Sequence, residues 1–146
     1  MEKIHFNIAI KAPREKVWDV LWNEDTYKVW ASAFSEDSGV RTDNWKKGSK
    51  VLFVDNSNSG MVSLIEEKIP NEFMSFKHLG EINNGVEDTT SERAQTWAGA
   101  HENYTLKESN GGTELEVNMD ITGEFKEMFS AMWPKALQKV KELSES

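Results

Sequence analysis

Strict alternation of apolar and polar residues opens the chain. Ile4, Phe6, Ile8 and Ile10 occupy every second position, and Lys3, His5, Asn7 and Lys11 fall on the opposite face. This period of two predicts a strand that buries one face. Pro13 follows at once and cannot continue the strand pattern, so the first element ends there.

Two short helices are predicted next. Pro13 suits the first turn of a helix, and Val17 and Leu21 follow at helical spacing until Trp22-Asn23 breaks the run. A second helix is predicted to begin near Asp25. Its apolar side chains fall on one shared face: Tyr27, Trp30 and Phe34.

From residue 38 onward, short strand-like runs alternate with turn residues. The predicted strands include residues 50–55, 61–69, 72–79, 97–107 and 114–121. The sequence Asn110-Gly111-Gly112 is a strong hairpin signal between the last two. Residues 80–96 are polar and are predicted to be a long excursion, in which Thr89 with Glu92, or Ser91, caps a short helix. We expect about six antiparallel strands after the helices.

The last segment, residues 125–143, has helical periodicity and an unusually wide apolar face. Its apolar residues are Phe125, Met128, Phe129, Met132, Trp133, Ala136, Leu137, Val140 and Leu143. At 100° per residue they cover about half of the circumference, whereas a surface helix needs a stripe of roughly 100°. Pro134 removes the hydrogen bond to the Ser130 carbonyl and predicts a kink. The wide face fits deep burial or one wall of a cavity, and the pattern leaves both open.

This order of elements predicts an α+β fold. The simplest packing is a helix-grip arrangement, in which a curved antiparallel sheet of about six to seven strands wraps around the long C-terminal helix and the two short helices close one end. A chain of 146 residues is long enough for one hydrophobic core and too short to expect two. We therefore expect one domain over residues 1–146.

Composition excludes several classes of partner. The formal net charge is −8, and no local basic cluster offsets it, so nucleic acid and anionic membrane surfaces are not expected partners. No apolar stretch is long enough to span a bilayer, so membrane insertion is not expected. The N-terminus has no signal-peptide core. A cytoplasmic location is expected.

Metal and cofactor chemistry have little support in the sequence. There are no cysteines, which excludes disulfides and sulfur-based zinc sites. His101-Glu102 resembles part of a metalloprotease motif, but Thr105 stands where its second histidine would be. No nucleophile elbow or phosphate loop is present. We predict neither a metal nor a cofactor.

Several short motifs mark the boundaries between these predicted elements. They are Ala12-Pro13 with Val17-Trp18, Leu21 and Trp30; Trp45-Lys46-Lys47-Gly48; Tyr104-Thr105-Leu106 before Gly111-Gly112-Thr113; and Trp133 with Ala136-Leu137. Together they resemble the helix-grip superfamily of START lipid-transfer domains, pollen-allergen proteins and polyketide cyclases. The closer resemblance is to the branch named after the activator of the heat-shock-protein-ninety ATPase.

The resemblance covers the whole chain and implies a sheet that grips the terminal helix around an apolar cavity. It does not imply one function, because members of the superfamily bind, transfer, cyclise or activate. In the eukaryotic activator the related domain is only the second half of a longer protein. The chaperone-docking first half has no counterpart in this sequence.

Strand and helix alternation selects the side chains expected to line such a cavity. They are Trp30, Phe34, Phe53, Met61, Phe76, Tyr104, Met119, Phe129, Met132 and Trp133. An error of one residue in register would move Phe53, Met61 and Met119 outside. If Phe76 and Tyr104 point inward, His78 and Glu102 do so too. That would place in the cavity two polar groups able to orient a ligand or exchange a proton, at a separation that the sequence does not predict.

The favoured function is binding of a small hydrophobic or amphipathic molecule between sheet and terminal helix. A co-chaperone role, activating a heat-shock chaperone ATPase, is the first alternative and requires an exposed patch and a solid interior. A cyclase or hydrolase that uses His78 and Glu102 is the second alternative. In an enzyme of this kind, His78→Ala and Glu102→Gln would abolish turnover.

Overall fold

The N-terminal alternation forms strand β1 (Glu2–Ile10), which pairs along its length with β8 (Gly112–Ile121). The computed structural model describes residues 2–34, 37–42 and 44–146. Ile4 lies opposite Met119 in this antiparallel pair. Ile4 and Ile10 are buried while Lys3 and His5 are exposed, as the period of two predicts.

Helices α1 (Arg14–Trp22) and α2 (Glu24–Ala31) follow with a single residue between them. That residue, Asn23, caps α2 by accepting a hydrogen bond from the Asp25 backbone N–H at 3.0 Å. The Trp30 indole N–H donates to the Leu21 carbonyl at 3.3 Å, so a buried side chain of α2 is tied to α1. Both predicted helices are therefore present.

The sheet contains eight strands within the described residues, all paired antiparallel. Besides β1 and β8 they are β2 (Gly39–Thr42), β3 (Lys50–Val54), β4 (Gly60–Ile69), β5 (Phe73–Asn83), β6 (Val86–Asp88) and β7 (His101–Ser109). The order is β1-β8-β7-β5-β4-β3-β2, with β6 on β5. The predicted number, six to seven, was low because β2 and β6 are too short to show alternation.

Residues 80–96 differ from the prediction of a polar excursion. Strand β5 continues to Asn83, and a turn at Asn84 (φ 50°) and Gly85 (φ 83°) leads into β6. Helix α3 (Glu92–Gln95) follows, and the Ser91 hydroxyl accepts from the Ala94 N–H at 3.1 Å, so Ser91 is the cap. Strand β7 then begins at His101, later than the predicted start at residue 97. The segment between the paired strands β5 and β7 therefore contains a β5–β6 hairpin and a short helix.

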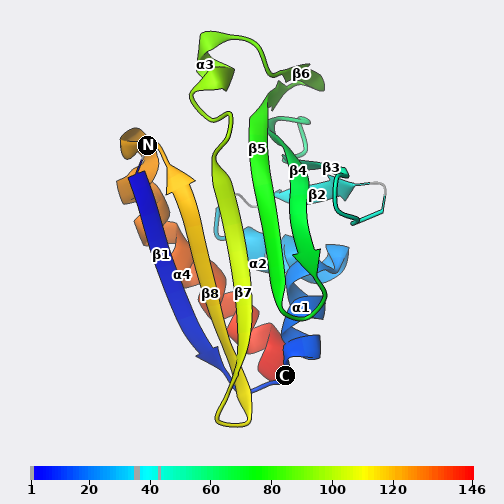
Figure 1. The fold of residues 1–146 in the computed structure, drawn as a ribbon, viewed down its shortest axis with the longest axis vertical. Coiled ribbons are helices and arrows are strands. Elements are labelled where there is room, and N and C mark those ends of the chain that lie inside the picture. Colours follow the sequence, from blue (N-terminus) through cyan, green and yellow to red (C-terminus); the bar gives the residue numbers. More distant parts are fainter. Residues whose placement is uncertain (1, 35–36, 43) are drawn as a thin grey trace.

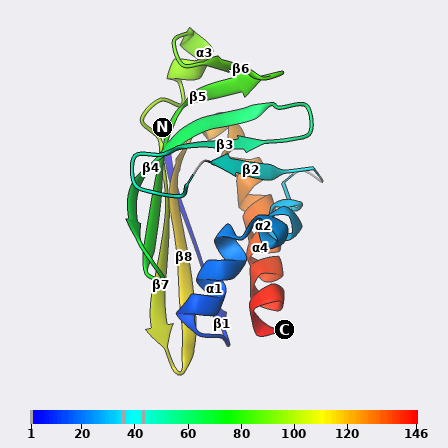
Figure 2. The same ribbon diagram turned by 90° about the vertical axis from the view of Figure 1, so that its right-hand side faces the viewer.

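Helix α4 (Gly123–Glu145) lies across the concave face of the sheet (Figures 1 and 2). It runs through Pro134 as one helix. In both views α1 lies near the C-terminal end of α4, and Figure 2 shows the sheet curling over the other end. This is the predicted α+β helix-grip fold. No helix among the described residues is both long enough and apolar enough to cross a membrane.

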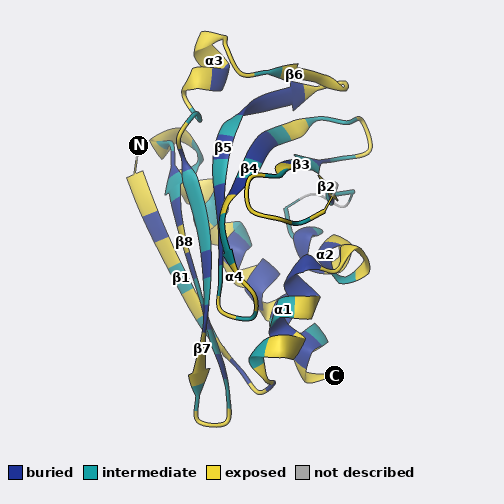
Figure 3. Ribbon diagram, turned by 45° about the vertical axis from the view of Figure 1, so that its right-hand side comes forward, coloured by how far each residue is buried: buried dark blue, intermediate teal, exposed yellow. Residues whose placement is uncertain are grey.

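The main core lies between the sheet and the helices (Figure 3). Its fully buried members include Val17, Ile65, Phe76, Leu115 and Val140. A smaller cluster of Val54, Val62 and Ile82 lies on the other face of the β3–β5 region. At one end of the main core, a space remains between α2, α4 and the sheet.

Candidate functional site

A pocket with a volume of about 340 Å³ opens between α2, the N-terminal half of α4 and the inner face of the sheet. Nine aromatic residues line it: Tyr27, Trp30, Phe34, Phe53, Trp97, Tyr104, Phe125, Phe129 and Trp133. Several are packed against each other, with ring centroids 5.0 Å apart for Phe34 and Trp133 and 5.5 Å for Trp97 and Phe125. The wall is thus largely apolar, as is typical of small-molecule sites.

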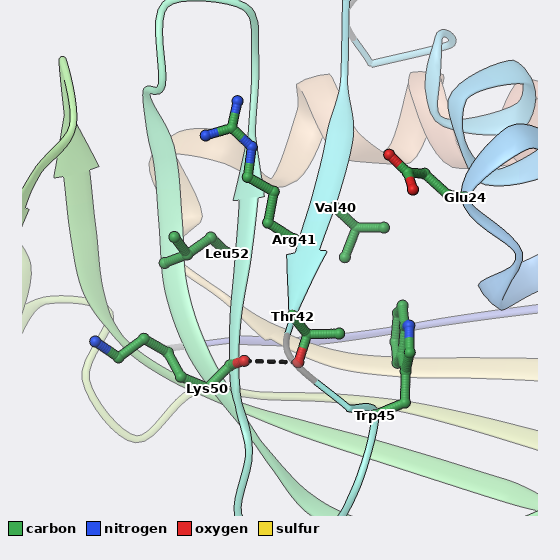
Figure 4. A pocket seen from close by; sticks show the side chains of 7 residues that line it. All are labelled: Glu24, Val40, Arg41, Thr42, Trp45, Lys50 and Leu52. Carbon is green, nitrogen blue, oxygen red and sulfur yellow. Dashed lines mark hydrogen bonds between the residues drawn. The ribbon is translucent and has the colours of Figure 1, made fainter.

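Another hollow lies outside β2 and β3 (Figure 4), with a volume of about 360 Å³. Its lining includes Val40 and Arg41, which are neighbours on β2 and so point to opposite sides of that strand. The Thr42 hydroxyl donates to the Lys50 carbonyl at 2.8 Å, and the Lys50 ammonium pairs with Glu87. This hollow wraps around an edge strand, and its Glu24 and Lys50 side chains are already paired, with Lys28 and Glu87. The aromatic pocket is the better candidate site.

The aromatic pocket collects most of the side chains that the sequence selected. Ten of the twelve line it: Trp30, Phe34, Phe53, Met61, His78, Glu102, Tyr104, Met119, Phe129 and Trp133. The register of β3, β4 and β8 therefore places Phe53, Met61 and Met119 on the inner face. That these residues bind a ligand stays a prediction.

Phe76 and Met132 were expected in the lining and lie elsewhere. Phe76 is fully buried behind it, with its ring centroid 5.1 Å from that of Phe53 and 6.1 Å from that of Tyr104. The rings of Phe53 and Tyr104 therefore separate Phe76 from the pocket. Met132 is half-buried on α4 and does not line the pocket. The buried stripe of α4 is centred on Trp133, Ala136 and Val140, and Met132 lies about 90° away from its centre.

Other lining residues were missed as site residues. Trp97 was assigned to the start of a strand, but it lies in the turn between α3 and β7 and its ring packs on Phe125. Phe125 and Met128 come from the first two turns of α4. The wide apolar face of residues 125–143 already indicated that both side chains could line a cavity. Only the curvature of the sheet shows which part of that face lines the pocket.

A chain of polar side chains begins at the inner wall, which His78, Glu102 and Tyr104 line, and ends at Ser63 behind it. The Ser63 hydroxyl lies 2.6 Å from His78 Nδ1, and His78 Nε2 lies 3.6 Å from Glu102 Oε1. The Tyr104 hydroxyl donates to Glu102 Oε2. Ser63, His78 and Tyr104 are buried, and the Glu102 side chain is 18% exposed. We call Ser63, His78, Glu102 and Tyr104 the polar chain.

Sheet geometry explains why these residues meet. Glu102 lies opposite Phe76 across the β5–β7 pair, and His78 is two residues further along β5, on the same face. Ser63 of β4 lies opposite His78. A register shift occurs next to this pair, where Val62 faces Gly80 while Ser63 faces His78, so Leu79 is the extra residue of a bulge. Ser63 was not predicted, since its partner depends on that bulge.

Burial keeps the two tyrosines of the pocket protonated. Desolvation raises the pKa of Tyr104 well above its ordinary value, and the neighbouring Glu102 carboxylate raises it further. Desolvation also raises the pKa of Tyr27, with a smaller contribution from Glu102. Both phenols are therefore hydrogen-bond donors at neutral pH. Because the Tyr104 hydroxyl donates its hydrogen to Glu102, the direction of the hydrogen bond at that end of the polar chain is fixed.

Comparison with known families agrees with this architecture. Residues 11–145 match the family model described as "Activator of Hsp90 ATPase homolog 1-like protein". The chain belongs to this family. A search of curated proteins finds no matching relative.

Solved structures show the same fold at low sequence identity. The solution structure of the Aha1 dimer from Colwellia psychrerythraea has a TM-score of 0.73 and 21% identity, covering 99% of this chain and 97% of that one. The AHSA1-like protein from Aeromonas hydrophila has a TM-score of 0.70 and 18% identity, covering 99% and 92%. CalU16 from Micromonospora echinospora has a TM-score of 0.67 and 15% identity, covering 97% and 75%. In this member of the family, the fold encloses the aromatic pocket and the polar chain.

Proposed function

We propose that this protein binds a small amphipathic molecule in the aromatic pocket. The observation that carries the proposal is the combination of an apolar wall of nine rings with the polar chain in a volume of about 340 Å³. Ligand sites in proteins range from about 300 to 1,000 Å³ and pair an apolar lining with a few placed polar groups. The pocket is near the lower end of that range, so it suits a compact molecule better than a long-chain lipid.

The apolar wall is unlike a plain core in one respect. Phe34, Phe53 and Phe129 are only partly buried although they pack against the core cluster. A filled interior would bury these rings further, since each fully buried aromatic side chain contributes roughly 1.5–3 kcal/mol. A ligand between them would remove the remaining apolar surface from water. This unburied aromatic surface supplies the driving force for binding.

Family membership also supports a co-chaperone role, in which the protein activates a heat-shock chaperone ATPase. That role favours a contiguous exposed apolar patch. The exposed large apolar residues of the described chain are Val29, Ile69, Val86 and Met128, and they lie on four different elements. The arrangement favours the ligand-binding role over the chaperone role.

The polar chain also has the groups of an acid–base pair, which supports the enzyme alternative. His78 Nε2 and Glu102 Oε1 are 3.6 Å apart, close enough for proton exchange through a substrate group. If the protein is a cyclase or hydrolase of this kind, His78→Ala and Glu102→Gln will abolish a pH-dependent turnover. If it is a binding protein, they will change affinity only.

The proposal is tested by a backbone amide NMR titration with pooled fatty acids, sterols and aromatic metabolites. We expect saturable shifts concentrated in residues 125–133 and in the facing parts of β3, β4 and β7. A variant that fills the pocket, Met61→Trp, is expected to lose these shifts. Leu64→Trp adds the same ring to the other face of β4 and is the matched control. Shifts that persist in Met61→Trp would contradict the proposal.

A further inference from the structure

The aromatic pocket has an asymmetric set of charges. Its lining includes three carboxylates, Asp55, Glu102 and Asp120, and no lysine or arginine from the part of the chain that the structure describes. A wall of this kind repels an anionic ligand and attracts a cationic one. The net charge of −8 acts in the same direction. The pocket can therefore discriminate between ligands by the sign of their charge.

Two of the three carboxylates already have partners. Asp120 pairs with the Lys3 ammonium at 2.7 Å. Asp55 accepts from the backbone N–H groups of Ser57 and Ser59 at 2.9 and 3.1 Å. Hydrogen bonds from the Ser57 hydroxyl and these backbone groups lower the pKa of Asp55, so it remains ionised and contributes a negative field at the pocket. Neither group needs a ligand.

Glu102 is different because its described partners leave acceptor capacity unused. Oε2 receives one hydrogen bond from Tyr104, and Oε1 lies 3.6 Å from His78 Nε2, longer than a normal hydrogen bond. An ionised carboxylate has about four acceptor sites. The Glu102 side chain is 18% exposed, and Glu102 lines the pocket. Glu102 is thus a largely desolvated anion with room for one more donor.

The histidine beside Glu102 need not neutralise it. The Ser63 hydroxyl can donate to His78 Nδ1 across 2.6 Å, which leaves a proton on Nε2 facing Glu102 and the ring neutral. In that tautomer the polar chain carries one net negative charge, located on Glu102. Around it stand aromatic rings, among them Tyr27, Phe53 and Tyr104, whose faces attract cations.

We propose that the ligand is a small organic cation, an arylalkyl or alkyl amine whose ammonium group pairs with Glu102 while its apolar part lies among the rings. This inference rests on the proposed binding function and names its ligand class. Charge pairing in a site shielded from water is stronger than at a surface, and aromatic faces stabilise the same cation. Neutral molecules of equal shape gain only the apolar contacts.

Three probes of matched shape test the preference: 2-phenylethylammonium, 2-phenylethanol and phenylacetate. Isothermal titration calorimetry on the full chain at neutral pH gives their relative affinities. We expect the ammonium probe to bind at least about tenfold more tightly than the alcohol, and the carboxylate probe more weakly than both. Glu102→Gln keeps the shape and a hydrogen-bonding side chain but removes the charge. It is expected to lower the affinity for the ammonium probe about tenfold or more and to change that for the alcohol by less than about threefold.

Glu116→Gln is the matched control, because it removes the same charge from the outer face of β8. It is expected to leave all three affinities within about twofold. Binding of the alcohol to Glu102→Gln also reports that the pocket is intact in that variant. Equal or tighter binding of the alcohol or the carboxylate to the natural protein would overturn the cation preference. If the pooled ligands bind and none of the three probes does, the preference also fails while the cavity proposal stands. If no compound binds at all, both proposals fail.

Discussion

The two halves of α4 present one continuous apolar face to two different surroundings. In the C-terminal half, Ala136, Leu137 and Val140 are buried in the core. In the N-terminal half, Phe125 and Phe129 are only half-buried and line the pocket, and Met128 is 44% exposed at its edge. The sequence pattern is the same in both halves. What differs is the surface opposite, since α1 lies near one end and the other faces the open curve of the sheet (Figure 2).

The comparison shows that a wide apolar helix face has no single meaning. Where neighbouring elements fill the space, each side chain stabilises the fold. Where the sheet curves away, side chains of the same kind line a cavity. The cavity lowers stability, and the packing of the other half offsets this loss. The helix is packed into the core at one end and lines the aromatic pocket at the other.

The largest expected effect is on the packed half. Leu137→Ala removes a buried side chain at 3% exposure and is expected to lower the free energy of unfolding by roughly 2–5 kcal/mol. Phe129→Ala, on the pocket half, is expected to cost less than about 2 kcal/mol, because that ring is only half-buried. Urea denaturation of both variants makes the measurement. A larger loss for Phe129→Ala than for Leu137→Ala would mean that the halves are packed alike.

Alkaline pH tests the burial of the pocket's tyrosines, Tyr27 and Tyr104, which are the only two in the chain. Their folded pKa values are raised by desolvation, whereas in the unfolded chain they ionise near pH 10. Their contribution to stability is therefore fully present below about pH 10 and is lost as the pH rises above it. The expected loss is about 1.4 kcal/mol per pH unit for each tyrosine.

Tyr104→Phe separates this effect from the titration of lysines, which is common to both proteins. Above about pH 10, the free energy of unfolding of the variant is expected to fall less steeply, by about 1.4 kcal/mol per pH unit, which is the contribution of one tyrosine. Urea denaturation between about pH 9 and pH 12 gives the slopes, and tyrosinate absorbance follows ionisation directly. Tyrosinate forming near pH 10 in a protein that is still folded would show that the tyrosines are open to water.

The smallest effect is expected at the edge of the pocket. Met128→Ala removes a side chain that is 44% exposed, and we expect a change in the free energy of unfolding of less than about 1 kcal/mol. The same variant is expected to weaken ligand binding, since Met128 lines the pocket. Thermal unfolding with and without ligand measures both quantities. A large loss of stability would place Met128 in the packed half instead.

Much of the fold could be predicted because its signals are local. Alternation marked β1, and Asn110-Gly111-Gly112 marked the β7–β8 hairpin, where Asn110 and Gly111 have positive φ. Alternation also gave the inward direction of Phe53, Met61 and Met119 without knowledge of their partners. These inferences need only neighbours in sequence.

The remaining features depend on residues that are far apart in sequence. Ser63 meets His78 only through the bulge at Leu79, and Trp97 reaches Phe125 from a turn. Phe76 follows the same alternation as His78, but two other rings cover it. Periodicity gives the face on which a side chain lies and not what stands in front of it. For that reason the size of the pocket could not be predicted from the chain.

Methionine methyl groups provide the most direct test of the division between a pocket and a packed core. Met61, Met119 and Met128 line the pocket, while Met74 is fully buried and lies outside the lining. The measurement is a ¹³C-methyl NMR spectrum of methionine-labelled protein, titrated with 2-phenylethylammonium and 2-phenylethanol. We predict saturable shifts of Met61, Met119 and Met128 with at least one of the two compounds, and a resonance of Met74 that does not move. Movement of Met74 with the three lining methyl groups unchanged, or no shift either with these two compounds or with the pooled ligands, would contradict a ligand site at this end of α4.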